Sequence, residues 1–201
     1  MSEVSWELLE HQIAACQRCC LCRGATHKVP GQGDRSAPLM LIGEGPGYQE
    51  DQQGLAFVGP AGQLLTRMLA AIGLPRERVY ICNTVKCRPP NNRTPEFAET
   101  QACLIHLRMQ VQLVRPKVIL LLGSTAARVA INPSLRITHE RGIWVERKGV
   151  WMLPTYHPSA LLHDPAKKRE AWEDLQRLRD KLQELGLYPD LYGQEAAHGD
   201  V

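Results

Sequence analysis

Cysteine is the residue type whose spacing in this chain points most directly to chemistry. Cys16 and Cys19 form a C-x2-C pair within a run of cysteines over residues 16–22, and single cysteines follow far along the chain at Cys87 and Cys103. A local pair and two distant cysteines can supply four thiolates to one site, which suits a tetrahedral zinc ion or an iron–sulfur cluster. The spacing does not choose between these two metal groups.

The chain has seven cysteines, and packing explains some of them better than metal binding does. Cys82 lies in an apolar stretch with the pattern of a strand, where a small buried side chain is the ordinary interpretation. The N-terminus lacks a basic start followed by an apolar core, and we therefore expect a cytoplasmic protein. Cysteines in such proteins serve metal ligation or redox chemistry more often than disulfides.

A glycine-rich turn follows the apolar run at residues 39–42. Glu44 is the only charged residue in this turn and stands between Gly43 and Gly45. A short apolar run that ends in glycines predicts a buried parallel strand, and ligands gather outside the carboxyl ends of such strands. The glycines leave backbone N–H groups free to approach an anion or a polar ring. A plain strand-to-helix connection is the alternative for the turn taken by itself.

Two further polar residues follow predicted strands. Asn83 comes after the apolar stretch 78–82, and His157 comes shortly after the stretch 150–153. An Asn amide offers an acceptor and two donors in one plane, so it can read the edge of a nucleobase, although a bare Asn more often caps a turn. His157 precedes a proline and lies where the other polar residues are expected to gather, so we interpret it as a site residue rather than as surface or core filler.

Phe57 lies in a glycine-flanked loop rather than on a periodic apolar face. Such an aromatic side chain could stack on a flat ligand. The alternative is that the ring plugs the core beneath the loop.

A stiff basic loop follows Asn83. It holds Lys86, Arg88 and Arg93 among prolines and asparagines. Cations on a rigid loop are suited to a phosphate backbone, and we predict that this loop contacts nucleic acid.

Strands and helices alternate along the chain, and this alternation must position the polar residues. The predicted strands are 39–42, 78–82 and 117–122, followed by a hairpin of 143–147 and 150–153. The predicted helices are 3–15, a helix entered near 59 and ending near 73, 95–114, 125–131 and 165–187. Alternation with buried strands predicts an α/β fold with three αβα layers and a central, mostly parallel sheet of about four strands.

Length, composition and net charge restrict the number of domains and the classes of function. With 201 residues and 44% hydrophobic residues the chain suits one domain over 1–201, and residues 190–201 are predicted to form a flexible tail. The net charge of +3 is mild, so a nucleic-acid site must be a local patch. No apolar run is long enough to span a bilayer. Nothing in the sequence suggests an obligate oligomer, and we expect a monomer.

The separated motifs, taken in order, resemble those of the family 4 uracil-DNA glycosylases. They occur between about Cys16 and Leu162, which is most of the chain. The motifs are Gly43-Glu44-Gly45-Pro46-Gly47, Gly54-Leu55-Ala56-Phe57-Val58-Gly59-Pro60-Ala61-Gly62, Asn83, and His157-Pro158-Ser159.

The resemblance implies a [4Fe–4S] cluster bound by the segments 16–22 and 87–103. Its ligands would be Cys16, Cys19, Cys87 and Cys103. The cluster would order the basic loop for DNA without a redox step.

The resemblance also implies the roles of residues around a flipped uracil in single- or double-stranded DNA. The base-binding residues would be Gly43, Phe57 and Asn83, with Phe57 stacking and Asn83 reading the base edge. The catalytic residues would be Glu44, Gly45 and His157, and the DNA contacts would be Arg88, Arg93 and Ser159. The best-known family of the superfamily has a water-positioning Asp in the glycine turn. Here that Asp is absent, and Glu44 is the candidate for its role.

The implied reaction is hydrolysis of the uracil N-glycosidic bond, which leaves an abasic site. Uracil departs as an anion, so the site must stabilise negative charge on the base, and His157 could donate a hydrogen bond to uracil O2. Two alternatives have other functions: a non-catalytic or covalent uracil-DNA-binding protein of the same superfamily, and a metal-stabilised nucleic-acid-binding module. The first has a basic, histidine-containing insertion that residues 84–95 lack.

Overall fold

The computed structural model describes residues 4–188 and has a single six-stranded sheet. The strand order is β1-β3-β2-β4-β6-β5. The central strands β2, β3, β4 and β6 are parallel, and β1 and β5 are antiparallel edge strands. The strands are β1 (Gln32–Gly33), β2 (Leu39–Gly43), β3 (Tyr80–Asn83), β4 (Val118–Leu122), β5 (Val145–Arg147) and β6 (Val150–Thr155).

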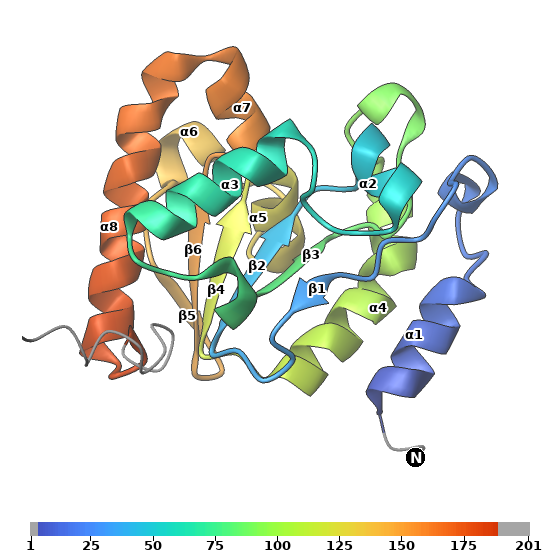
Figure 1. Ribbon diagram of the computed structural model, residues 1–201, viewed down its shortest axis with the longest axis horizontal. Helices are drawn as coiled ribbons and strands as arrows, with labels where there is room; N and C mark the ends of the chain where they lie inside the picture. Colours follow the sequence, from blue (N-terminus) through green and yellow to red (C-terminus); the bar gives the residue numbers. More distant parts are fainter. Residues whose placement is uncertain (1–3, 189–201) are drawn as a thin grey trace, which may run out of the picture.

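Helices lie on both faces of the sheet (Figure 1). The α-helices are α1 (Trp6–Ala14), α2 (Tyr48–Gln53), α3 (Pro60–Ala71), α4 (Phe97–Val114), α5 (Ser124–Ala130), α6 (Ile137–Glu140), α7 (Pro158–His163) and α8 (Lys168–Glu184). Short 3₁₀ turns are η1 (Cys20–Arg23), η2 (Arg76–Arg78), η3 (Pro90–Asn92) and η4 (Pro165–Lys167).

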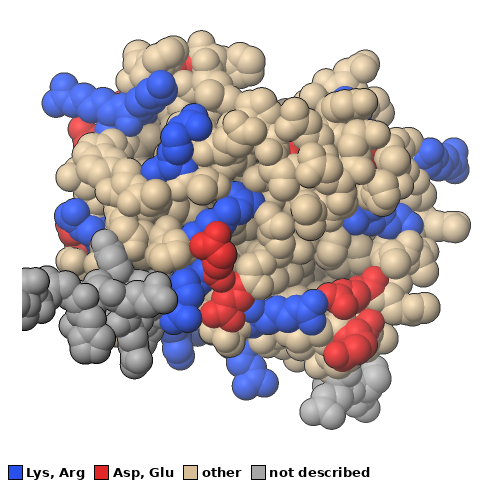
Figure 2. All heavy atoms as spheres, in the orientation of Figure 1, with Lys and Arg blue, Asp and Glu red and all other residues tan. Residues whose placement is uncertain are grey.

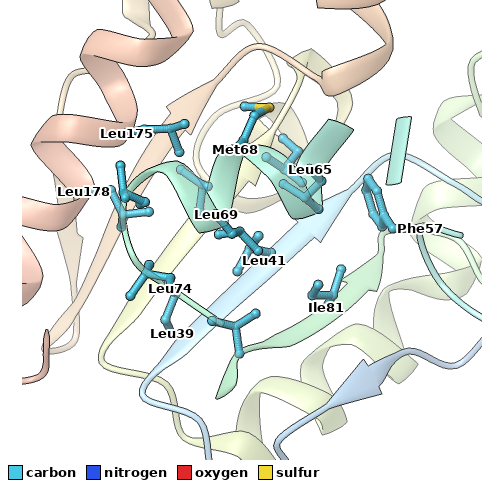
Figure 3. Close-up of a cluster of buried hydrophobic side chains, with 14 of the residues drawn as sticks. Leu39, Leu41, Phe57, Leu65, Met68, Leu69, Leu74, Ile81, Leu175 and Leu178 are labelled. Carbon is cyan, nitrogen blue, oxygen red and sulfur yellow. The ribbon is translucent and has the colours of Figure 1, made fainter. Parts of the chain in front are cut away.

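Alternating strand residues form the core on each face. Leu39, Leu41 and Leu120 pack with α3 and α8 in one cluster. Figure 3 shows Leu39 and Leu41 within it. Met40 and Ile119 point to the opposite face and pack with α4 and α5. The central strands are therefore buried on both sides, as the continuous apolar runs predicted.

The register of the sheet brings the strand ends to one edge. Gly43, the last residue of β2, is paired with Asn83, the last residue of β3. On the other side Leu122 of β4 is paired with Thr155 of β6. The glycine turn, Asn83 and the segment that leads to His157 therefore leave the sheet at the same edge, where parallel α/β sheets bind ligands.

A buried ion pair fixes the end of β6. Asp174 of α8 is fully buried, and its Oδ2 accepts hydrogen bonds from Thr155 Oγ1 at 2.7 Å and from Arg141 Nε at 3.0 Å. Burial raises the pKa of the Asp174 carboxyl, while Thr155 and Arg141 lower it. Because Thr155 is two residues from His157, this contact ties the histidine segment to α8.

The predicted three-layer α/β fold with a central, mostly parallel sheet is confirmed, but the sheet has six strands rather than about four. Some elements were not predicted, among them strand β1, which pairs with β3, and the short helices α2 and α7. The predicted tail at 190–201 lies outside the described residues.

Among residues 4–188, no helix has the length and apolar character needed to cross a membrane.

Candidate active site and cysteine cavity

A cavity of about 480 Å³ opens at the strand ends. Its walls include the turn after β2, Phe57, Asn83 and His157, so it brings together residues as distant in the sequence as Glu44 and His157. Most Asp and Glu side chains visible in Figure 2 lie in the lower half of that face, away from the upper ends of β2 and β4 in the same orientation. At that end of the sheet the cavity is lined by the carboxylates of Glu44 and Glu50 and by Arg93.

Gly43 permits the close packing of the cavity floor. A Cβ atom at this position would lie 2.4 Å from Phe57 Cζ and 2.5 Å from Asn83 Oδ1. The turn is also held from the neighbouring strand, because Thr84 N donates to the Gly43 carbonyl at 2.9 Å and Thr84 Oγ1 donates to the Glu44 carbonyl at 2.5 Å. The glycine is required here by a close approach and not by a left-handed backbone.

Glu44 and Gly45 both line the cavity. Thr125 Oγ1, at the start of α5, donates to Glu44 Oε2 at 2.5 Å. This contact fixes the direction of the carboxylate. Gly45 is closely packed as well, because a Cβ there would lie 2.9 Å from the Val85 side chain.

Phe57 belongs to both the core and the cavity. The residue is 6% exposed and packs at the edge of the core cluster (Figure 3). Its ring centroid lies 5.7 Å from that of His157. Its backbone is left-handed, with φ of 52°, which is uncommon for a bulky residue. The position of Phe57 is therefore compatible with both alternatives from the sequence, stacking on a flat ligand and filling the core beneath the loop.

Glu50, which the sequence analysis missed, holds the Phe57 loop. Its Oε1 accepts hydrogen bonds from Val58 N at 2.9 Å and from Gly59 N at 2.7 Å. Arg76 adds a hydrogen bond from Nη2 to the Ala56 carbonyl at 2.8 Å. Glu50 gives no sequence signal of its own, because it is one of several polar residues in a segment that reads as a surface loop.

Asn83 presents an acceptor to the cavity. The residue is 1% exposed, and its Oδ1 is buried without a hydrogen-bond partner among residues 4–188. An unpaired buried amide oxygen costs free energy, on the order of 1–3 kcal/mol. A ligand that donates a hydrogen bond would remove this cost.

His157 presents a donor to the same cavity. Ser159 N donates to His157 Nδ1 at 3.2 Å, and Ser159 Oγ lies 2.7 Å from the same nitrogen. Because Nδ1 accepts, the proton of the neutral ring is on Nε2, which is buried and lacks a partner within the described part of the chain. Burial lowers the pKa of His157 from 6.5 to about 4, so the ring is neutral at neutral pH.

The basic loop differs from its prediction in one respect. Lys86, predicted to face a phosphate backbone, is 2% exposed, so that prediction was wrong. Arg88 is partly exposed, donates from Nε to Asn92 Oδ1 at 2.7 Å and lies 5.1 Å over the Tyr48 ring. Arg93 lines the cavity but forms a bidentate ion pair with Glu99, at 2.7 and 2.8 Å.

A second, smaller cavity gathers the cysteines that sequence spacing singled out. Its walls include the thiol-bearing residues Cys16, Cys19, Cys22, Cys87 and Cys103. Burial and the neighbouring Cys103, Cys19 and Cys16 raise the pKa of the Cys87 thiol to about 12. Thiols that disfavour one another's ionised form in this way suit a positively charged metal group that accepts thiolates. In residues 4–188, no three His, Cys, Asp or Glu side chains are arranged to hold a single metal ion.

His106 of α4 lies in the wall of the cysteine cavity. The residue is 3% exposed, and both ring nitrogens are buried without partners in the described structure. Two orphaned nitrogens beside a group of thiols indicate that this cavity is built for a further polar group.

The remaining cysteines have separate environments. Cys82 is fully buried in β3, as its packing interpretation predicted. Cys20 is exposed and donates from Sγ to Glu99 Oε1 at 3.2 Å.

The comparisons with known proteins agree with this architecture. Residues 30–176 match the model of the uracil DNA glycosylase superfamily, so the chain belongs to that superfamily. Within it the chain is similar to three proteins named type-4 uracil-DNA glycosylase, which places it in the type-4 family. The identity is 39% with the protein of Sulfurisphaera tokodaii, over 94% of this chain and 88% of the relative. It is 40% for Thermotoga maritima, over 90% and 96%, and 42% for Archaeoglobus fulgidus, over 83% and 88%.

We predict that the His157 ring is neutral at pH 7. The folded chain binds a proton on this ring only near pH 4, whereas the unfolded chain binds it near 6.5. The contribution of His157 to the free energy of unfolding is therefore complete above pH 6.5 and is lost as the pH falls toward 4. We expect ¹⁵N NMR at pH 7 to show a neutral ring protonated on Nε2, with a titration midpoint near 4. A midpoint above 6, or a proton on Nδ1, would contradict the geometry.

Proposed function

We propose that this protein is a DNA repair glycosylase that flips uracil out of DNA and hydrolyses its N-glycosidic bond, leaving an abasic site. One observation carries the proposal: a buried acceptor on Asn83 and a buried donor on His157 line one cavity, and neither has a partner in the described residues. Membership of the type-4 family supports the same activity.

Asn83 selects the base. Its Oδ1 accepts from uracil N3–H, and the NH₂ group of the same amide donates to O4. Cytosine has an acceptor at N3 and a donor at N4, so it opposes the amide at both positions and leaves buried polar groups unpaired. A site built on hydrogen bonds rejects such a mismatch far more strongly than an apolar pocket would.

His157 stabilises the departing base. Its Nε2–H donates to uracil O2 and strengthens that bond as negative charge develops on the base. The low pKa of the ring keeps it neutral, so it acts as a hydrogen-bond donor rather than as a general acid. Ser159 holds the ring through Nδ1 and lies where the chain turns into α7.

Phe57 stabilises the flipped base by stacking. Base extrusion costs a few kcal/mol, least at a mismatch, and stacking on an aromatic ring recovers about 1–3 kcal/mol. Gly43 contributes by leaving room for the ring and the amide on the cavity floor.

Glu44 is our candidate for positioning the water that attacks the sugar, and Gly45 keeps the turn open beside it. The hydrogen bond from Thr125 to Oε2 leaves Oε1 as the oxygen able to accept from a water molecule.

DNA contacts come from the rim of the cavity. Arg88 and Ser159 are the residues that we propose to bind phosphates. Arg93, which forms an ion pair with Glu99, is proposed as a further DNA contact. We propose that the chain is a single domain over 1–201 and acts as a monomer.

We also propose that the cysteine cavity holds a [4Fe–4S] cluster through Cys16, Cys19, Cys87 and Cys103. The donor set fits, since thiolates are the ligands that such clusters use and the unpaired His106 lies among them. When bound, the cluster supplies a covalent tie between the segment after α1, the basic loop and α4. The protein's own residues perform every step of the hydrolysis.

Base release tests the proposed function. The substrate is a labelled oligonucleotide containing one uracil, treated with alkali after incubation. We expect cleavage at uracil by the wild-type protein and a loss of about 100-fold or more in Asn83→Ala, because the amide that reads the base is removed. An oligonucleotide with cytosine at the same position should remain intact.

The same assay distinguishes the alternatives. A wild-type protein that retains its metal and binds uracil-containing DNA without releasing the base would contradict the enzyme and favour a binding protein. A stable covalent complex with the DNA would favour the covalent binder.

The cluster proposal predicts a spectroscopic loss. Substituting Cys87 or Cys103 by Ala should abolish the broad visible absorption of an iron–sulfur cluster and lower the iron content. Cys82→Ala is the matched control, since Cys82 is buried in β3 outside this cavity, and it should keep both. Full iron content in Cys87→Ala would contradict the ligand set, and stoichiometric zinc in the wild-type protein would contradict the cluster.

A further inference from the structure

Lys86 is an unusual residue for the interior of a protein. It is 2% exposed, and its Nζ donates to the Asn83 carbonyl at 2.6 Å and to Gln110 Oε1 at 2.5 Å. In the part of the chain that the structure describes, no carboxylate forms an ion pair with it. A buried lysine is costly to place, so a site that retains one needs it for more than packing.

The partner of Lys86 on α4 is itself fixed. Gln110 is fully buried, and its Nε2 donates to Tyr80 Oη at 2.9 Å and to the Pro30 carbonyl at 2.6 Å. Gln110 therefore cannot turn its oxygen away from Lys86 without losing these contacts. Gln110 therefore fixes the ammonium group of Lys86, and this ammonium group in turn fixes the Asn83 carbonyl.

The backbone of Lys86 faces the other cavity. Its carbonyl accepts a hydrogen bond from Val29 N at 2.7 Å. The residue also lines the cysteine cavity and precedes Cys87 directly. One residue thus contacts the base-reading Asn83 through its side chain, lines the cysteine cavity and is bonded directly to Cys87.

We propose that Lys86 is a positioning residue that sets the orientation of Asn83 and so couples the cysteine site to base selection. This inference rests on the proposed function. The ammonium group fixes the Asn83 peptide, and the fixed peptide aims Oδ1 into the cavity. When the cysteine segments are drawn together, the main chain of Lys86 is held, and the Asn83 amide is presented in one direction. Preorganisation of this kind lowers the cost of forming the recognition hydrogen bonds.

A double-mutant cycle on the metal-loaded protein tests this coupling. Lys86→Met keeps most of the length of the side chain and removes its donors. We expect it to slow single-turnover release of uracil about tenfold or more. In the Lys86→Met background, Asn83→Ala should then cost at least about tenfold less than it costs in the wild type, because the amide is already misplaced.

Lys117→Met is the matched control. Lys117 is exposed and precedes β4, at the opposite end of the sheet from the cavity. It should leave the rate within about twofold of wild type and preserve the full effect of Asn83→Ala. If the losses in Lys86→Met and Asn83→Ala simply multiply, Lys86 does not act through Asn83 and the proposal is overturned.

Two further measurements test the proposal if Lys86→Met fails to fold or to hold the metal. Lys86→Arg retains a cation and several donors, and it should preserve more of the wild-type rate and of the coupling than Lys86→Met does. In the wild-type protein, the ¹⁵N signal of the Lys86 ammonium should shift when free uracil saturates the site. An unchanged signal at saturation overturns the proposal. A wild-type protein that releases no uracil defeats the proposed function instead, so the two failures are distinguishable.

Discussion

The rest of the structure depends on the parallel register that places Gly43 directly beside Asn83. This pairing brings the end of β2 and the end of β3 so close that a Cβ at Gly43 would meet the Asn83 amide and the Phe57 ring. The floor of the cavity is therefore built from backbone, one amide and one ring, with no room for adjustment. Because the strands themselves are buried on both faces, the site inherits the rigidity of the core.

Hydrogen bonds from buried or partly buried side chains hold the loops above this floor. Glu50 satisfies two N–H groups of the loop that carries Phe57, and Thr125 fixes the carboxylate of Glu44. Against this background of satisfied groups, the unpaired Oδ1 of Asn83 and Nε2 of His157 stand out. Among residues 4–188 the other buried side chain with unpaired polar atoms is His106, which lies in the separate cysteine cavity. An acceptor and a donor left open in one cavity are suited to a ligand.

Part of this organisation could be predicted from the sequence because it depends on local pattern. Apolar runs gave the buried strands, and the polar residues that follow them had to gather at one edge. Other features depend on partners distant in the sequence. Lys86 reads as part of a basic surface loop, and only the position of Gln110 on α4 shows that it is buried. Strand β1 was missed because two residues carry no periodicity, and its existence depends on pairing with β3.

Inhibition of base release by free uracil and by 3-methyluracil tests the central claim most directly. The claim is that the cavity recognises the base through an acceptor on Asn83 that requires N3–H. Methylation removes this donor and adds bulk at the same position, and it leaves O2 free for His157. The account predicts that uracil inhibits and that 3-methyluracil inhibits at least about tenfold more weakly, because the acceptor stays unpaired. Equal inhibition by the two compounds would contradict it.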